Sequence, residues 1–165
     1  MTTALLCQLI LLLYHQATTC FDLFPFNGAR HYTSSQRWAE MGSNAILMGL
    51  APIGFAFDVH ALKVYGAYYY FVLFAVEIIV WWIPYFTVPG GIWRRVYNVL
   101  LSVSTSNYEQ GDTLSHWLDI HRKLHAGTWT ILPQREGRIV PNVEHTLLHV
   151  LTLVTAGVTF RAVYA

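Results

Sequence analysis

The chain has 165 residues, of which 55% are hydrophobic and only 12% carry a formal charge. A soluble domain has about 25% charged residues, so this composition predicts a membrane protein with a single domain over residues 1–165. The net charge of +1 excludes the broad basic surface of a nucleic-acid-binding protein, so we expect the lipid bilayer, and not nucleic acid, as a partner.

Four apolar segments predict an all-α fold in which four transmembrane helices form a bundle. Their predicted ranges are about 4–21, 41–60, 64–88 and 143–164. Each is close to the roughly 20 residues that a helix needs to cross the hydrocarbon core. Only a few residues, His60 to Lys63, connect the second and third segments, so these two helices should be antiparallel neighbours.

Small and aromatic residues add detail to two of the predicted spans. In the second, the small residues predict close contact with a neighbouring helix: Gly42, Ala45, Gly49 and Ala56. In the third, aromatic residues near both ends, including Tyr68 and the pair Trp81-Trp82, are typical of the two interfaces of a bilayer.

The segment 89–142 before the last span is too polar to cross a membrane. Over residues 92–103, apolar and basic residues fall on opposite helical faces, which predicts an amphipathic helix lying in the interface. A second helix is predicted from Asp112 or Thr113 to Ala126, where Gly127 ends it, and residues 128–142 are predicted to form a loop.

The distribution of basic residues predicts the orientation. The segments before the second and fourth spans contain eight of the ten basic residues, and only Lys63 and Arg161 belong to the other side. Because cytoplasmic loops are enriched in Lys and Arg, both termini are predicted on the non-cytoplasmic side.

Glu77 is the only charged residue within the third span. A carboxylate at the centre of a bilayer costs on the order of 2.5–3.5 kcal/mol even on a lenient insertion scale, so Glu77 should face the interior of the bundle. There it can be protonated, bonded to His149 or His15, or exposed to a water-filled cavity.

Polar residues recur at helical spacing in the last and first spans. His145, His149, Thr152 and Thr159 form a stripe on the last span, and Gln8, His15 and Asp22 lie seven residues apart on the first. A stripe of this kind predicts either a polar path lined by the helices or plain hydrogen bonding between them.

The histidines other than His60 are predicted to gather in the cytoplasmic half. Two pairs, His121 with His125 and His145 with His149, have the four-residue spacing that places both imidazoles on one face of a helix. Together with Glu144 these four histidines are a candidate metal site, with a metal ion as candidate cofactor; the alternative is packed, hydrogen-bonded histidines.

Three functions remain open. The first is a small transporter, channel or binding protein whose intramembrane pocket takes a proton, metal ion or small solute; its predicted residues are Glu77, His149, His15, His145, Gln8 and Thr152. The second is a membrane enzyme that acts on a lipophilic substrate through the His/Glu site at the cytoplasmic face. The third is an accessory subunit of a membrane complex. Because four short spans enclose little volume, we expect a homo-oligomer or a larger complex.

Overall fold

The computed structural model describes residues 2–87, 94–95, 113–136 and 138–165. Every regular element in these ranges is a helix, which confirms the all-α prediction. Apart from residues 94 and 95, the predicted interfacial helix over 92–103 lies outside the described residues.

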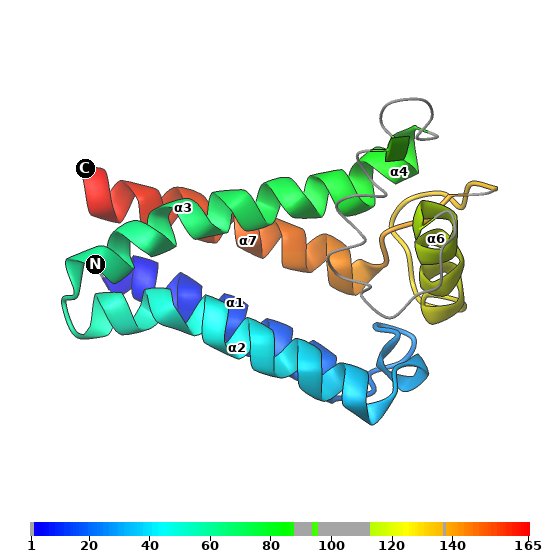
Figure 1. The fold of residues 1–165 in the computed structure, drawn as a ribbon, viewed down its shortest axis with the longest axis horizontal. Coiled ribbons are helices and arrows are strands. Elements are labelled where there is room, and N and C mark those ends of the chain that lie inside the picture. Colours follow the sequence, from blue (N-terminus) through cyan, green and yellow to red (C-terminus); the bar gives the residue numbers. More distant parts are fainter. Residues whose placement is uncertain (1, 88–93, 96–112, 137) are drawn as a thin grey trace.

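In the part of the chain that the structure describes, four long helices run along the molecule: α1 (Thr2–Cys20), α2 (Ser34–Ala56), α3 (His60–Glu77) and α7 (Val143–Tyr164) (Figure 1). Both α1 and α3 pack against α2 and against α7. The two termini and the turn between α2 and α3 lie at one end of the molecule (Figure 1). At the opposite end lie the short helices η1 (Ala29–His31) and α6 (Thr113–Leu124).

Local sequence signals explain where several helices begin and end. α2 starts with a capping box, in which Thr33 Oγ1 accepts a bond from the Gln36 amide and Gln36 Oε1 accepts one from the Thr33 amide. Asn142 caps α7 by accepting a bond from the His145 amide at 2.9 Å. Gly127 follows α6 with a φ of +75°, a conformation that glycine adopts without strain.

α3 does not end as a regular helix but continues through a π-helical turn, η2 (Ile78–Trp82), into α4 (Ile83–Phe86). In this turn the Ile83 amide donates to the carbonyl of Ile78, five residues back. Pro84 accounts for the irregularity, since its ring lacks an N–H and would clash with the carbonyl four residues earlier in a regular α-helix.

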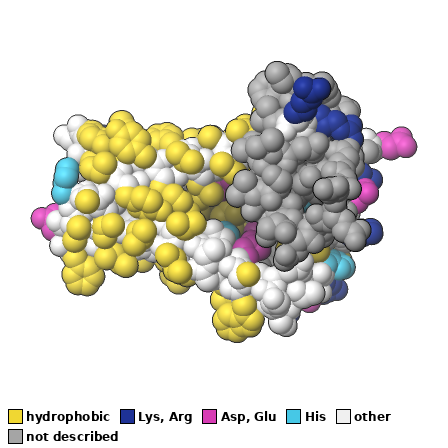
Figure 2. Space-filling model, viewed as in Figure 1, with side chains coloured by type: hydrophobic (Ala, Val, Ile, Leu, Met, Phe, Trp, Pro, Cys, Tyr) yellow, Lys and Arg dark blue, Asp and Glu magenta, His cyan; other side chains and the backbone are white. Residues whose placement is uncertain are grey.

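Among the described residues, three helices are long and apolar enough to cross a membrane: Thr3–Cys20, His60–Phe86 and Val143–Tyr164. Large apolar side chains cover much of the surface at the end that holds the termini, whereas most of the visible basic side chains lie at the other end (Figure 2). The predicted second span, 41–60, is not among the three. Its helix begins earlier, at Ser34, and its first half carries Arg37, Glu40 and several uncharged polar residues.

The boundary between the second and third spans also differs from the prediction. α2 ends at Ala56 and α3 already begins at His60, so the connection is Phe57–Val59 rather than residues 60–63. Asp58 allows this tight turn by adopting a positive φ of 58°, and its carboxylate pairs with Lys63 in the first turn of α3.

The small residues that bring α2 and α3 together are not the predicted ones. A Cβ atom at Gly42 or Gly49 would meet no atom within 4 Å, and Ala45 and Ala56 are exposed. The close approach occurs instead at Gly54, against Leu62, and at Gly66, against Ala51. It therefore lies near the end of the molecule that holds the termini.

This contact leads to a stability prediction for the variant Gly66→Ala, with Gly42→Ala as the matched control. A Cβ at residue 66 would lie 2.6 Å from the Cβ of Ala51, so we expect Gly66→Ala to lower the free energy of unfolding by about 1–3 kcal/mol. Gly42→Ala should be neutral or stabilising by up to about 1 kcal/mol, because only the helix propensity changes. Denaturant titration in detergent micelles measures both, and equal effects of the two substitutions would contradict the packing described here.

Candidate functional site

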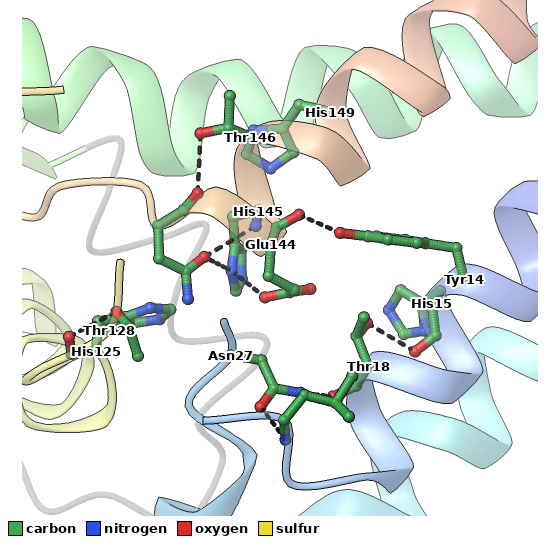
Figure 3. A network of polar contacts seen from close by, with 12 residues as sticks. Tyr14, His15, Thr18, Asn27, His125, Thr128, Glu144, His145, Thr146 and His149 are labelled. Atoms are coloured by element: carbon green, nitrogen blue, oxygen red, sulfur yellow. Dashed lines mark hydrogen bonds and ion pairs between the residues drawn. The ribbon is translucent and has the colours of Figure 1, made fainter. Parts of the chain in front are cut away.

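The ionisable residues gather where the helices meet η1 and α6, and Figure 3 shows the network that they form. α7 supplies Glu144, His145 and His149 from its first two turns. Glu144 and His149 are buried, whereas the next residues on the outer face, such as Val150, are exposed. The polar stripe predicted on the last span therefore faces the interior of the protein.

Glu144 and His145 form the shortest polar contact of the network. Glu144 Oε2 lies 2.6 Å from His145 Nδ1, and Asn142 Oδ1 lies 2.9 Å from the same nitrogen. A carboxylate and an amide oxygen at this nitrogen favour an imidazole protonated there, because both oxygens accept hydrogen bonds. Tyr14 of α1 donates to the backbone carbonyl of Glu144 at 2.9 Å and so ties α1 to the start of α7.

The π-helical turn directs two tryptophans toward these histidines. Trp82 Nε1 donates to His149 Nδ1 at 2.8 Å, which places the proton of a neutral His149 on its other ring nitrogen. The Trp81 ring lies 4.1 Å from the His145 ring, 5.1 Å from His125 and 5.3 Å from His121, measured between ring centroids. Trp81 is thus the apolar centre of the histidine cluster.

The remaining two imidazoles come from α6 and from the residue that follows it. His121 and His125 stack with their ring centroids 6.1 Å apart, and His125 contacts the His145 ring edge-on at 4.9 Å. Gly28 makes room for the end of α6, since a Cβ at residue 28 would lie 2.2 Å from the carbonyl oxygen of Leu124. The loop before η1 therefore holds this helix against the cluster.

Glu77 lies inside the protein, as predicted, with 7% of its surface exposed. Its Oε1 is 2.9 Å from the hydroxyl of Thr152, so the predicted hydrogen bond to His149 or His15 is replaced by one to the threonine one turn further along α7. Its other oxygen, Oε2, is buried without a hydrogen-bond partner.

A cavity of about 340 Å³ connects these residues. Four of the six residues predicted for the ligand pathway line it: His15, Glu77, His145 and His149. His121 lines it as well, and a smaller cavity of about 50 Å³ next to it is bounded by Glu144 and His125. Four of the predicted pathway residues and the five predicted metal residues thus lie in one region of the protein.

The other polar residues of α1 and α7 lie elsewhere. Thr152 donates to Glu77 but is not among the residues that line the cavity, and Gln8 donates to Thr159 at 3.1 Å, closer to the termini. Asp22 does not continue the stripe of α1, because that helix ends at Cys20. Its carboxylate is exposed and accepts hydrogen bonds from Arg30, which hold its pKa below the usual range.

Several site residues escaped the sequence analysis. Trp81 and Trp82 were predicted to lie at a bilayer interface, but the π-helical turn directs both side chains toward the histidines. On α2, the side chains facing the cavity occur every four residues: Gln36, Glu40, Asn44 and Met48. This four-residue spacing is visible in the sequence and would have predicted a polar face on α2. Glu40 lies 3.8 Å from His15, with its side chain 43% exposed.

Within the part of the chain that the structure describes, no three His, Cys, Asp or Glu side chains are arranged to hold one metal ion. The four imidazoles surround Trp81 instead of converging on a common point. The metal site with His121, His125, His145, His149 and Glu144 stays a prediction.

Comparisons of the chain with protein-family models, with curated proteins and with solved structures find no match. Its function is therefore inferred from the geometry of the site.

His125 leads to a prediction about pH. Burial disfavours its charged form, and the nearby His145, His121 and His31 would repel it, so the pKa of His125 lies well below its usual value of 6.5. A histidine whose pKa is lowered by folding stabilises the folded state above the unfolded pKa, and this contribution is lost as the pH falls below it. We expect the amides of α6 to lose protection from hydrogen exchange between pH 7.5 and pH 5, after correction for intrinsic rates.

In the variant His125→Gln this pH dependence should shrink. The control is His60→Gln, which changes an exposed histidine at the opposite end and should leave the profile unaltered. An undiminished loss of protection in His125→Gln would show that another group controls the docking of α6.

Proposed function

We propose that the protein is a small transporter, channel or binding protein whose membrane-embedded pocket takes a proton, metal ion or small solute. One observation carries this proposal. Glu77, His15 and His149 come from three different helices, line the same cavity, and each has a buried side-chain atom without a hydrogen-bond partner.

Unpartnered atoms of this kind are costly. A buried donor or acceptor without a partner costs about 1–3 kcal/mol, and more when the group is charged. A ligand or bound water that bonds to Glu77 Oε2, His15 Nδ1 and His149 Nε2 would remove that cost. The deficit therefore favours a polar or charged occupant over a purely structural role for these residues.

The packed core favours a pocket over an open pore. Toward the end that holds the termini, Leu11, Met48, Ala51, Tyr70 and Ala156 form one cluster of buried side chains. This core fills the space between the four long helices beyond Glu77, so movement of a solute across the protein requires a change of conformation.

We further propose that α2 crosses the bilayer as a fourth span, so that the four long helices form a transmembrane bundle. α1 and α3 run in the same direction, and α2 returns the chain between them (Figure 1). With 23 residues α2 is about 35 Å long, enough to cross the hydrocarbon core. Large apolar side chains on its outer face, including Ile46, Leu47 and Ile53, are exposed.

Cysteine labelling in intact cells tests this topology. In a background without Cys7 and Cys20, we expect an impermeant maleimide to label Thr3→Cys and Ala165→Cys from outside, and Gln134→Cys only after permeabilisation. If α2 did not cross, positions 3 and 165 would lie on opposite sides. Labelling of Gln134→Cys alone in intact cells would keep four spans but reverse the predicted orientation.

Substitution of Glu77 tests the pocket. We expect at least one of three cations, Zn²⁺, tetramethylammonium or benzyltrimethylammonium, to bind the full-length protein saturably in isothermal titration calorimetry. Glu77→Gln should weaken that binding at least about tenfold, because it removes the buried carboxylate and keeps the shape. Asp58→Asn, which neutralises an exposed carboxylate at the opposite end, is the control and should not change the affinity. Equal affinities of Glu77→Gln and the unmodified protein would refute a role of Glu77 in the pocket.

The Glu144–His145 pair favours a second candidate function, an enzyme that acts on a lipophilic substrate. A carboxylate that orients an imidazole is the arrangement used for general acid–base catalysis, and the 2.6 Å contact provides it. In this alternative water would be the nucleophile and His145 the base. Turnover lost in His145→Asn and retained in Glu77→Gln would favour the enzyme over the binding protein.

A further inference from the structure

We propose that the ligand of the 340 Å³ cavity is an organic cation, an ammonium group attached to a small apolar body. This inference rests on the proposed function and specifies the chemical class of its solute. The charge, size and walls of the cavity support it independently.

The charged residues at the cavity favour a cation. Two carboxylates line it, Glu40 from α2 and Glu77 from α3, and none of the described lining residues is Lys or Arg. A third carboxylate, Glu144, lies behind His145 and is already engaged by it. Imidazoles and amides complete the polar lining, and any positive charge on His145 is paired with Glu144 outside the lining, so it leaves Glu40 and Glu77 uncompensated.

The size of the cavity favours a molecule over a bare ion. A volume of about 340 Å³ falls within the roughly 300–1,000 Å³ of small-molecule sites, and such sites have mostly apolar walls with a few placed polar groups. The apolar part of the lining comes from α2, α3, α6 and α7: Met48, Leu73, Ile120, Leu124 and Leu148. These side chains offer nothing to a hydrated metal ion, but they suit a hydrocarbon group.

Aromatic rings complete the match. Two aromatic residues from different segments of the chain line the cavity: Trp81 belongs to η2, and Tyr32 follows directly after η1. Indole faces attract ammonium groups more strongly than other aromatic side chains do, and aromatic cages are a known solution for binding quaternary ammonium ions. Glu77 Oε2, which lacks a partner, can in addition accept a hydrogen bond from a protonated amine.

The imidazoles are poorly arranged for the alternative, a metal ion. His149 Nδ1 already accepts a bond from Trp82, so the other nitrogen of a neutral His149 carries the proton and offers no lone pair to a metal. Among the described residues no three potential ligands converge. A metal would require the described side chains to rearrange, whereas an ammonium ion uses the cavity as it stands.

The test is equilibrium binding to the full-length protein in dodecyl maltoside micelles, whose head group carries no charge. The probes are benzyltrimethylammonium, benzyl alcohol, benzenesulfonate and Zn²⁺. We expect benzyltrimethylammonium to bind at least tenfold more tightly than benzyl alcohol, which has the same ring without the charge, and benzenesulfonate not to bind.

Trp81→Leu should weaken binding of the ammonium probe about three- to thirtyfold, and Trp81→Phe should retain most of it. Trp129→Leu is the control, because Trp129 is 59% exposed and lies outside the cavity lining.

The outcomes separate this inference from the function on which it rests. Binding of Zn²⁺ alone, lost in Glu77→Gln, would overturn the organic cation and leave a cation pocket. Equal affinity for benzyl alcohol and the ammonium probe, or an equal loss in Trp129→Leu and Trp81→Leu, would also overturn it. No saturable binding of any probe, by protein that still unfolds cooperatively in the same micelles, would overturn both proposals.

Discussion

The free-energy cost of placing ionisable side chains among apolar helices governs this structure. The outer surfaces of the helices are covered by side chains such as Leu13, Val72 and Val150, which suit hydrocarbon. Glu77, Glu144 and His149 are enclosed within the same helices. Since an unpaired buried charge is far more costly than a buried hydrocarbon group, these residues must meet one another, a ligand or water. The histidine cluster follows from that requirement.

The position of the cavity follows from how α2 and α3 pack. At one end they touch through Gly54 and Gly66, where any larger residue would collide with the neighbouring helix. From there the two helices diverge toward the end with η1 and α6 (Figure 1). The same contact that closes the molecule at one end therefore leaves space at the other, and the polar first half of α2 lines that space. The angle between α2 and α3 therefore accounts both for their close contact near the termini and for the cavity at the other end.

The apolar segments made most of the fold predictable, because length and hydropathy alone define a membrane helix. The inward direction of Glu77 and of the stripe His149, Thr152 and Thr159 was also predictable, since lipid is a poor neighbour for these groups. What the sequence could not show was the partner of each group. Glu77 bonds to Thr152 and not to a histidine, and the helices touch at Gly54 and Gly66 and not at Gly42 and Gly49. Both outcomes depend on the rotation of each helix about its axis. No local pattern determines that rotation.

The π-helical turn is the clearest case of a feature beyond sequence patterns, and it also determines the character of the site. Because Pro84 interrupts the regular helix, η2 turns Trp81 into the histidine cluster and Trp82 toward His149. A ring at this place contacts four imidazoles and gives the cavity an electron-rich face. Because such a face attracts positive charge, it acts in the same sense as Glu40 and Glu77, the two carboxylates of the lining, and this supports the proposal of a cationic occupant.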